Sequence, residues 1–292
     1  MKRIDVLGKI SNEYKFVVEI GAGPTPFHGT RLIVDKYPFD NYERSADMRA
    51  IAPVIKADAA ALPFLDKSVD LLFMSQVIEH IPDPLRFLKE ARRVARDIYL
   101  ESPSAVREVI FGWSFHKWVI RTEGCKWIFY KNDLPQLCGG YFHNESDVFF
   151  LEYTANNFDK FNNYFYGPVD KLEFEMATVS ALEYLSQLSG KVDFPAMGET
   201  PRHPGTVKSV LYLLGKNLLP SGIRTAVRDI VLKKKNPARI AVPDLKSVAN
   251  GKLMCVSCHR ALSSLDKVCE CGASLKQING IYSFDLEDYR NS

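Results

Sequence analysis

The chain has 292 residues, of which 46% are hydrophobic, and a formal net charge of +3. A chain of this length can bury a full core, so we expect one large domain and a smaller addition. No apolar run approaches the roughly eighteen residues that cross a bilayer, which argues against an integral membrane protein. Residues 1–5 carry no apolar signal region, and we therefore expect a cytoplasmic protein.

The positive charge is concentrated in one stretch. Residues 201–240 contain nine Lys or Arg against a single acid, Asp229, which gives a local charge of +8 against −5 for the rest of the chain. This asymmetry sets the stretch apart from the main domain. We predict a large domain over 1–190, a basic helical segment over 191–247 and a small module over 248–292.

Five apolar strands are predicted in the first hundred residues. They cover residues 16–20, 32–35, 54–58, 69–74 and 98–100. Their β-branched and aliphatic composition is typical of parallel strands that are covered on both faces. Only about eleven residues separate the first two strands, so we expect a short helix or a loop between them.

An amphipathic helix is predicted between Pro84 and Arg96, because its apolar residues recur at helical spacing. Pro84 suits the first helical turn, and Asp83 before it is a candidate N-cap. Strands that alternate with helices or loops predict an α/β fold with a doubly wound, mostly parallel sheet. The aromatic-rich stretch 111–166 is expected to complete this sheet, and its rings form either core or an acceptor pocket.

Small or acidic residues follow three consecutive predicted strands. They are Gly21, Ala22 and Gly23, then Asp35, then Asp58 with Ala59. In an open parallel sheet, ligands bind beyond the carboxyl ends of the strands. A glycine turn admits a ligand close to the backbone, while carboxylates can accept hydrogen bonds from ribose hydroxyls and an adenine amine. The set predicts an adenosine-containing cofactor, although each acid alone could equally form a turn or a helix cap.

A nicotinamide dinucleotide is the rival cofactor. It would require G-x-G-x-x-G at the start of a helix and an acid about twenty residues further on. Pro26 stands where the third glycine is needed, and Asp35 follows Gly21 by only fourteen residues. We therefore rank the nicotinamide cofactor behind the first interpretation.

The stretches Glu19–Gly23, Asp58–Phe64 and Ser68–Ile81 resemble the class I S-adenosylmethionine-dependent methyltransferases, in particular their type 11-like branch. The resemblance covers about residues 15–104 and implies a Rossmann-like sheet of seven strands. Thr25-Pro26 replaces the family's third glycine, so the path of this loop departs from the pattern.

The same resemblance implies a site for S-adenosylmethionine. Glu19 and the glycine turn would lie near the methionine part, and Asp35 would bind the ribose. Asp58 and Ala59 would contact the adenine. The residues beside the sulfonium would be Ser75 and Gln76.

Proton transfer is a secondary requirement for such a reaction. The sulfonium is already a good electrophile, so the protein mainly has to align donor and acceptor. A base matters only for a hydroxyl or a protonated amine, and His80 and His116 are the candidates, ahead of His143 and Glu101. A structural role for His80, as a cap or a loop contact, is the alternative.

The tail contains four cysteines in two close pairs, namely Cys255, Cys258, Cys269 and Cys271. Four thiolates on two tight turns can hold one structural zinc ion, and this tail resembles the small zinc-ribbon modules joined to methyltransferases of this branch. The second pair has a gap of one residue, so His259 is an alternative ligand, and free thiols are the other interpretation.

Residues 206–235 carry two apolar helical stripes among basic side chains. Three interpretations compete: a helical pair packed on the main domain, a peripheral contact with a membrane surface, and a nucleic-acid arm, which is the least favoured.

The sequence as a whole predicts S-adenosylmethionine-dependent methyl transfer to a small-molecule, lipid-linked or sugar-linked acceptor. An RNA methyltransferase that grips phosphates through the zinc ribbon and the basic segment is the alternative enzyme. The alternative without turnover is a binding or scaffold protein that has kept the fold.

Overall fold

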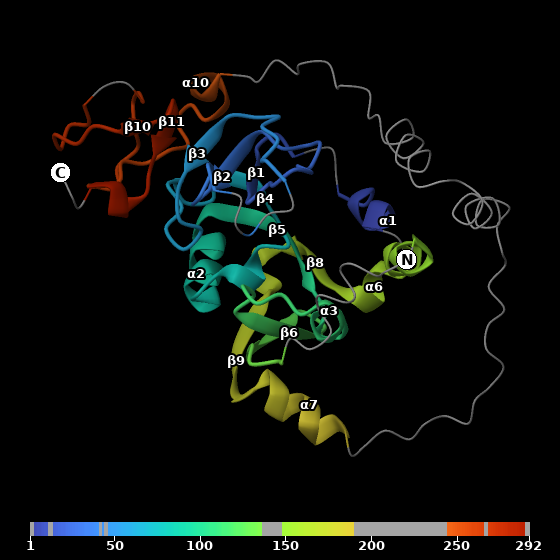
Figure 1. Ribbon diagram of the computed structural model, residues 1–292. Coiled ribbons are helices and arrows are strands. Elements are labelled where there is room, and N and C mark those ends of the chain that lie inside the picture. Colours follow the sequence, from blue (N-terminus) through green and yellow to red (C-terminus); the bar gives the residue numbers. More distant parts are fainter. Residues whose placement is uncertain are drawn as a thin grey trace, which may run out of the picture. The chain divides into compact units, whose positions relative to one another are not determined.

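The computed structural model describes two sheets and the helices around them (Figure 1). The residues that it describes are 3–10, 14–40, 43, 46–135, 148–189, 244–265 and 268–289. The strands of the large sheet are β1 (Val17–Ile20), β2 (Leu32–Asp35), β3 (Val54–Lys56), β4 (Val69–Ser75), β5 (Ala95–Pro103), β8 (Asn162–Pro168), β10 (Lys276–Ile278) and β11 (Ile281–Ser283). The strands of the small sheet are β6 (Trp118–Glu123), β7 (Lys126–Lys131) and β9 (Glu173–Ser180).

Short helices connect and cover these strands. The α-helices are α1 (Arg3–Leu7), α2 (Pro84–Val94), α3 (Ala105–Phe111), α5 (Val148–Asn156), α6 (Phe158–Phe161), α7 (Ala181–Ser189) and α10 (Leu245–Val248). The 3₁₀ turns are η1 (Ile78–His80), η2 (Val169–Lys171) and η3 (Leu286–Tyr289). No helix in the described part of the chain is long and apolar enough to cross a membrane.

The large sheet has the order β10-β11-β3-β2-β1-β4-β5-β8. Strands β3, β2, β1, β4 and β5 are parallel, and β8 runs antiparallel to β5. The order reverses between β1 and β4, which is the switch point where such sheets bind ligands. The predicted α/β fold with a doubly wound, mostly parallel sheet is therefore confirmed. The strand count differs from the predicted seven, because eight described strands join this sheet.

Both faces of the central strands are buried, as their apolar composition predicts. Val18 and Leu72 face the cluster that contains Phe87 of α2, whereas Val17 and Leu71 face the cluster that contains α1. The residues between β1 and β2 form no helix. Instead, Phe27 stacks on Phe73 with ring centroids 4.5 Å apart and covers this part of the sheet.

Helix α2 begins where the sequence predicts and ends earlier. The Asp83 side chain accepts a hydrogen bond of 2.9 Å from the backbone N–H of Arg86, which confirms the predicted cap. The helix ends at Val94 rather than Arg96, because Ala95 is already paired with Val69 as the first residue of β5.

The C-terminal residues are attached to the main sheet. Strand β11 pairs in parallel with β3, and residues 1–186 and 242–292 form one compact unit. The division of the chain into three domains stays a prediction. Within it, the small module over 248–292 contributes this strand to the main sheet. The physical reason is that β3 would otherwise be an edge strand with unpaired backbone groups, which β11 satisfies. The predicted basic stripes over 206–235 lie outside the described residues.

Candidate functional site

The turn after β1 places backbone at the switch point of the sheet. Gly21 and Gly23 have φ of 64° and 56°, a conformation that side chains rarely adopt. A Cβ on Gly21 would lie 2.6 Å from Cγ2 of Val77, so this position has no room for a side chain. Glycine is therefore required at position 21 both by conformation and by space.

The buried side chain of Glu19 holds the loop that follows this turn through hydrogen bonds. Its carboxylate accepts hydrogen bonds of 3.1 and 3.0 Å from the backbone N–H of Phe27 and another from the Thr30 hydroxyl. Burial raises the pKa of Glu19 to about 7, against the lowering effect of these hydrogen bonds. The side chain thus fixes the loop between β1 and β2 and carries a proton that is easily gained or lost near neutral pH.

Two hollows open at the carboxyl ends of the strands. The turn hollow, of about 550 Å³, is lined among others by Glu19, Gly21, Ala22, Gly23, Ser75 and Gln76. The acidic hollow, of about 560 Å³, is lined among others by Asp35, Asp58, Ala59 and His80. Gly21 and Gln76 line both hollows. The nine predicted cofactor residues thus line two adjoining cavities.

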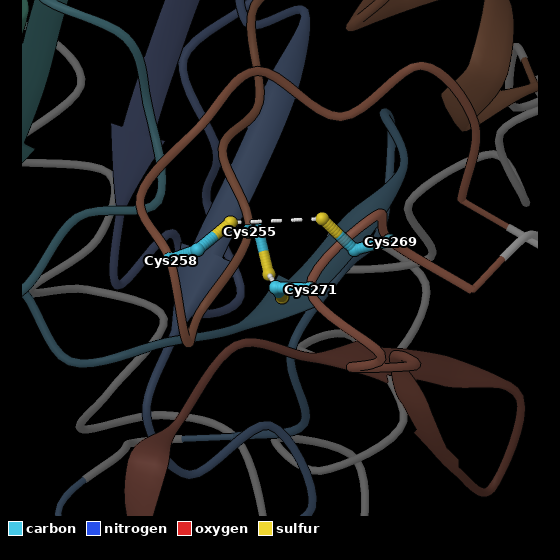
Figure 2. A group of neighbouring side chains, drawn as sticks. All are labelled: Cys255, Cys258, Cys269 and Cys271. Atoms are coloured by element: carbon cyan, nitrogen blue, oxygen red, sulfur yellow. Dashed lines mark hydrogen bonds between the residues drawn. The ribbon is translucent and has the colours of Figure 1, made fainter.

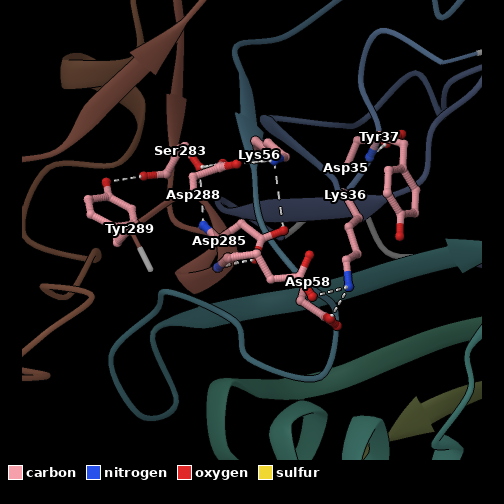
Figure 3. A network of polar contacts seen from close by, with 10 residues as sticks. Asp35, Lys36, Tyr37, Lys56, Asp58, Ser283, Asp285, Asp288 and Tyr289 are labelled. Carbon is pink, nitrogen blue, oxygen red and sulfur yellow. Dashed lines mark hydrogen bonds and ion pairs between the residues drawn. The ribbon is translucent and has the colours of Figure 1, made fainter. Parts of the chain in front are cut away.

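The two acids at the ends of β2 and β3 both face the acidic hollow. The Asp35 carboxylate accepts a 2.8 Å hydrogen bond from the N–H of Tyr37, and Asp58 accepts one of 2.8 Å from the N–H of Ala60. Lys36 Nζ lies 2.8 Å from Asp58 Oδ2 (Figure 3). Burial acts to raise the pKa of Asp58, but the hydrogen bonds from Lys36 and Ala60 outweigh it and leave that pKa below its usual range.

The loop after β4 is anchored on the next strand. Gln76 has a φ of 57°, and its side-chain amide donates hydrogen bonds to Glu101 at 2.9 Å and to Asn162 at 3.2 Å. Arg3 donates to Glu101 at 2.9 Å and to Ser75 Oγ at 2.8 Å. Glu101, expected among the candidate bases, is therefore a buried acceptor at the centre of this network.

Several residues of the site were missed at the level of sequence. Arg3 and Arg107 line the turn hollow, and Lys36 lines the acidic hollow. Arg3 is 98 positions from Glu101, its ion-pair partner, so no local pattern could reveal the contact. Lys36 directly follows Asp35 at the end of a strand, and this position was the one sequence signal that could have placed Lys36 in the site.

The aromatic stretch divides between core and pocket. Trp127 and Phe129 of β7 are fully buried in the main core. Phe158 and Phe161, both buried, line the turn hollow. This stretch therefore supplies both core rings and rings that line a cavity. Its role as an acceptor pocket stays a prediction.

His80 and His116 lie together, with ring centroids 4.7 Å apart. His80 lines the acidic hollow, whereas His116 is buried with Nδ1 2.6 Å from Glu108 Oε1. Burial lowers the pKa of each imidazole to about 3, which makes both poor proton acceptors as they stand. Their predicted role as bases stays a prediction. His143 lies outside the described residues.

The four predicted cysteine ligands converge in the C-terminal segment (Figure 2). Sγ of Cys255 lies 3.7 Å from that of Cys271, and Sγ of Cys258 lies 3.6 Å from that of Cys269. These separations exceed a disulfide bond and agree with the roughly 3.8 Å between thiolates on one tetrahedral zinc ion. The group contains four cysteines without His259.

Part of the chain is similar in sequence to known methyltransferases. Residues 36–97 match the family model described as a methyltransferase domain. An uncharacterized methyltransferase from Mycobacterium sp. (strain KMS) is 35% identical over 86 residues, which are 27% of this chain and 34% of that protein. One from Mycobacteroides abscessus is 34% identical over 91 residues, 27% of this chain and 35% of that protein. The chain thus spans about a third of the length of the curated relatives it matches.

Part of the chain is also similar to solved structures. A SAM-dependent methyltransferase from Thermotoga maritima has 26% sequence identity and a TM-score of 0.27, over 35% of this chain and 49% of that one. A SAM-dependent methyltransferase from Aquifex aeolicus has 18% identity and a TM-score of 0.26, over 35% of this chain and 64% of that one. The chain has a Rossmann-like α/β fold, and its residues 36–97 are similar to methyltransferase domains.

Proposed function

We propose that the chain is an S-adenosylmethionine-dependent methyltransferase whose cofactor lies along the acidic hollow and the turn hollow. The observation that carries the proposal is that strand ends of β1, β2, β3 and β4 all contribute predicted ligands to these two adjoining cavities. A glycine turn, a carboxylate for a ribose and a second carboxylate for an adenine amine stand in the order that adenosine requires.

Each residue would have a distinct task toward the cofactor. Asp35 would accept hydrogen bonds from the ribose hydroxyls, and Asp58 from the adenine amine. The turn at Gly21 would let the methionine part pass close to the backbone. Ser75, which lines the turn hollow, and Gln76, which lines both hollows, would flank the sulfonium. When bound, the cofactor supplies an electrophilic methyl group.

The acceptor would then occupy the turn hollow beyond Gln76. This cavity combines buried rings of Phe158 and Phe161 with the guanidinium groups of Arg3 and Arg107. Such a wall suits a small-molecule, lipid-linked or sugar-linked acceptor that presents both apolar and anionic surface. The main contribution of the protein to the rate would be alignment of donor and acceptor, which can supply much of the acceleration without a base.

We also propose that the cysteine cluster holds one structural Zn²⁺. Four thiolates complete a tetrahedral site and leave no open position, so the ion would stabilise the C-terminal segment rather than take part in methyl transfer. The alternatives of an RNA methyltransferase and of a scaffold without turnover stay predictions. The basic segment on which the RNA alternative depends lies outside the described residues.

Transfer of a labelled methyl group tests the proposal. The full chain is incubated with radioactive S-adenosylmethionine and fractionated metabolites and lipids, and labelled products are separated. The Asp35→Ala variant is expected to lose labelling, while Asp170→Ala, at an exposed carboxylate that lines neither hollow, is expected to retain it. Equal labelling by wild type and Asp35→Ala would contradict the proposed site.

A further inference from the structure

A second cluster of metal-ligating side chains lies outside the cysteine site. Glu79, His80 and His116 each offer one ligand atom, and these atoms all lie within 4.8 Å of one another. Ligand atoms on one zinc ion are about 3.3 Å apart when their bonds to the metal are near 2.0–2.1 Å. The three groups therefore need only a small closure to share one ion.

The carboxylate of Glu79 is the unusual member. Its side chain is 1% exposed, and neither oxygen has a hydrogen-bond partner on another described residue. A buried carboxylate without a donor is costly, and native structures compensate such groups with a partner or a metal ion. A second carboxylate lies close by, because Glu108 is also buried and contacts His116.

A carboxylate lies near Nδ1 of each of the two histidines. Nδ1 of His116 lies 2.6 Å from the Glu108 carboxylate, so a proton on Nδ1 leaves the Nε2 lone pair free to bind an ion. Nδ1 of His80 lies 3.0 Å from Oε2 of Glu43 but forms no hydrogen bond. His116 thus has the carboxylate partner that is typical of a metal-bound histidine, whereas His80 only has a carboxylate nearby.

We propose that Glu79, His80 and His116 form a binding site for one divalent transition metal ion of the Zn²⁺ type. Two imidazoles and one carboxylate are a ligand set that zinc accepts, and three protein ligands leave a further position open. His80 lines the acidic hollow, so that position can be reached by water or by an oxygen of a second molecule. The proposal does not depend on methyl transfer.

The test is the metal content and coordination of the full-length protein after purification in zinc-containing medium. Wild type is expected to hold two zinc ions per chain, and X-ray absorption should resolve a sulfur shell near about 2.3 Å and a nitrogen or oxygen shell near about 2.0–2.1 Å. Glu79→Gln is expected to hold one ion with sulfur ligands alone. The matched control Glu90→Gln, on α2 and away from the cluster, should retain both.

A second variant distinguishes loss of the metal site from loss of the fold. His116→Gln is expected to bind added Zn²⁺ at least tenfold more weakly than wild type at the non-sulfur site while its circular dichroism is unchanged. With the cysteine site filled and the second site emptied by mild chelation, added Zn²⁺ should raise the melting temperature of the wild type and not that of either variant. A wild-type protein with only sulfur-bound zinc, or variants that keep the nitrogen and oxygen shell, would overturn the proposal.

Discussion

Lys36 Nζ lies 2.8 Å from Asp58 Oδ2, so a cation from the end of β2 holds the carboxylate that follows β3 (Figure 3). Both side chains are partly exposed in the acidic hollow. The contact fixes the orientation of Asp58 and keeps it ionised, while its carboxylate retains capacity for a further donor such as an adenine amine.

Replacing Lys36 tests this positioning role. Lys36→Met should weaken the binding of S-adenosylhomocysteine by up to about fivefold, since an ion pair this exposed contributes at most about 1 kcal/mol. Isothermal titration calorimetry at low salt measures the effect. Lys171→Met, an exposed lysine in η2, is the control, and an equal loss in both variants would disprove the role of Lys36.

The pKa of Glu19 predicts a pH dependence of stability. In the folded protein this pKa is raised from 4.5 to about 7, chiefly by burial. The folded state therefore holds the proton more tightly than the unfolded chain, and this stabilisation is complete below pH 4.5 and lost as the pH rises through 7. Relative to Glu19→Gln, the wild-type free energy of unfolding should fall by about 3 kcal/mol between these limits.

Urea unfolding of both proteins at a series of pH values measures this difference. The comparison with Glu19→Gln cancels the titration of the other acids, which the two proteins share. A difference that stays constant across the range would show that Glu19 is ionised throughout.

Lys56 is predicted to be a main attachment of the C-terminal segment. Its Nζ lies 2.7 Å from both carboxylate oxygens of Asp288 and 3.9 Å from the buried Asp285 (Figure 3). Lys56→Met would remove the cation that these two acids share, and we expect a loss of about 2 kcal/mol in the free energy of unfolding. Urea unfolding measures it.

A surface ion pair provides the control for this prediction. Lys126 pairs with Glu175 on the small sheet, where both side chains are more exposed than those of Lys56 and Asp288. Lys126→Met should therefore change the free energy of unfolding little. If both variants lose the same stability, the contact between Lys56 and Asp288 has no special role.

Loss of the cysteine site should loosen the edge of the large sheet. In Cys255→Ser/Cys258→Ser we expect the sulfur-bound zinc to be lost, the melting temperature to fall by several degrees and amide exchange in β3 to accelerate, because β11 pairs with β3. Hydrogen exchange with mass spectrometry resolves this effect. Cys125→Ser, at an exposed cysteine outside the cluster, should leave all three unchanged. Unchanged amide exchange in β3 would show that the zinc site does not stabilise the edge of the large sheet.

Local patterns predicted the centre of the fold and much of the site. The apolar, β-branched composition of buried strands predicts where they lie. Asp35 and Asp58 each follow such a strand, which places both acids on one edge of the sheet. The cap at Asp83 follows from Pro84 directly after it, and the cysteine group from the two close pairs and the resemblance to zinc ribbons. These features depend on residues that are near neighbours in the sequence.

The remaining features depend on contacts between distant segments. Strand β11 has three residues, too few for a recognisable period, and it pairs with a strand more than two hundred positions away. Arg3 reaches the site from the N-terminal helix. The burial of Glu79 beside His116 is decided by how η1 packs against the segment after α3, which no sequence period records.

The most direct test of the account is calorimetric titration of the full chain with S-adenosylhomocysteine, alongside NADH. We predict saturable heat with a micromolar dissociation constant for S-adenosylhomocysteine, at least tenfold weaker binding to Asp35→Ala and to Asp58→Ala, and no heat with NADH. Absence of heat with S-adenosylhomocysteine, or binding that both alanine variants retain in full, would contradict the assignment of the two hollows to this cofactor.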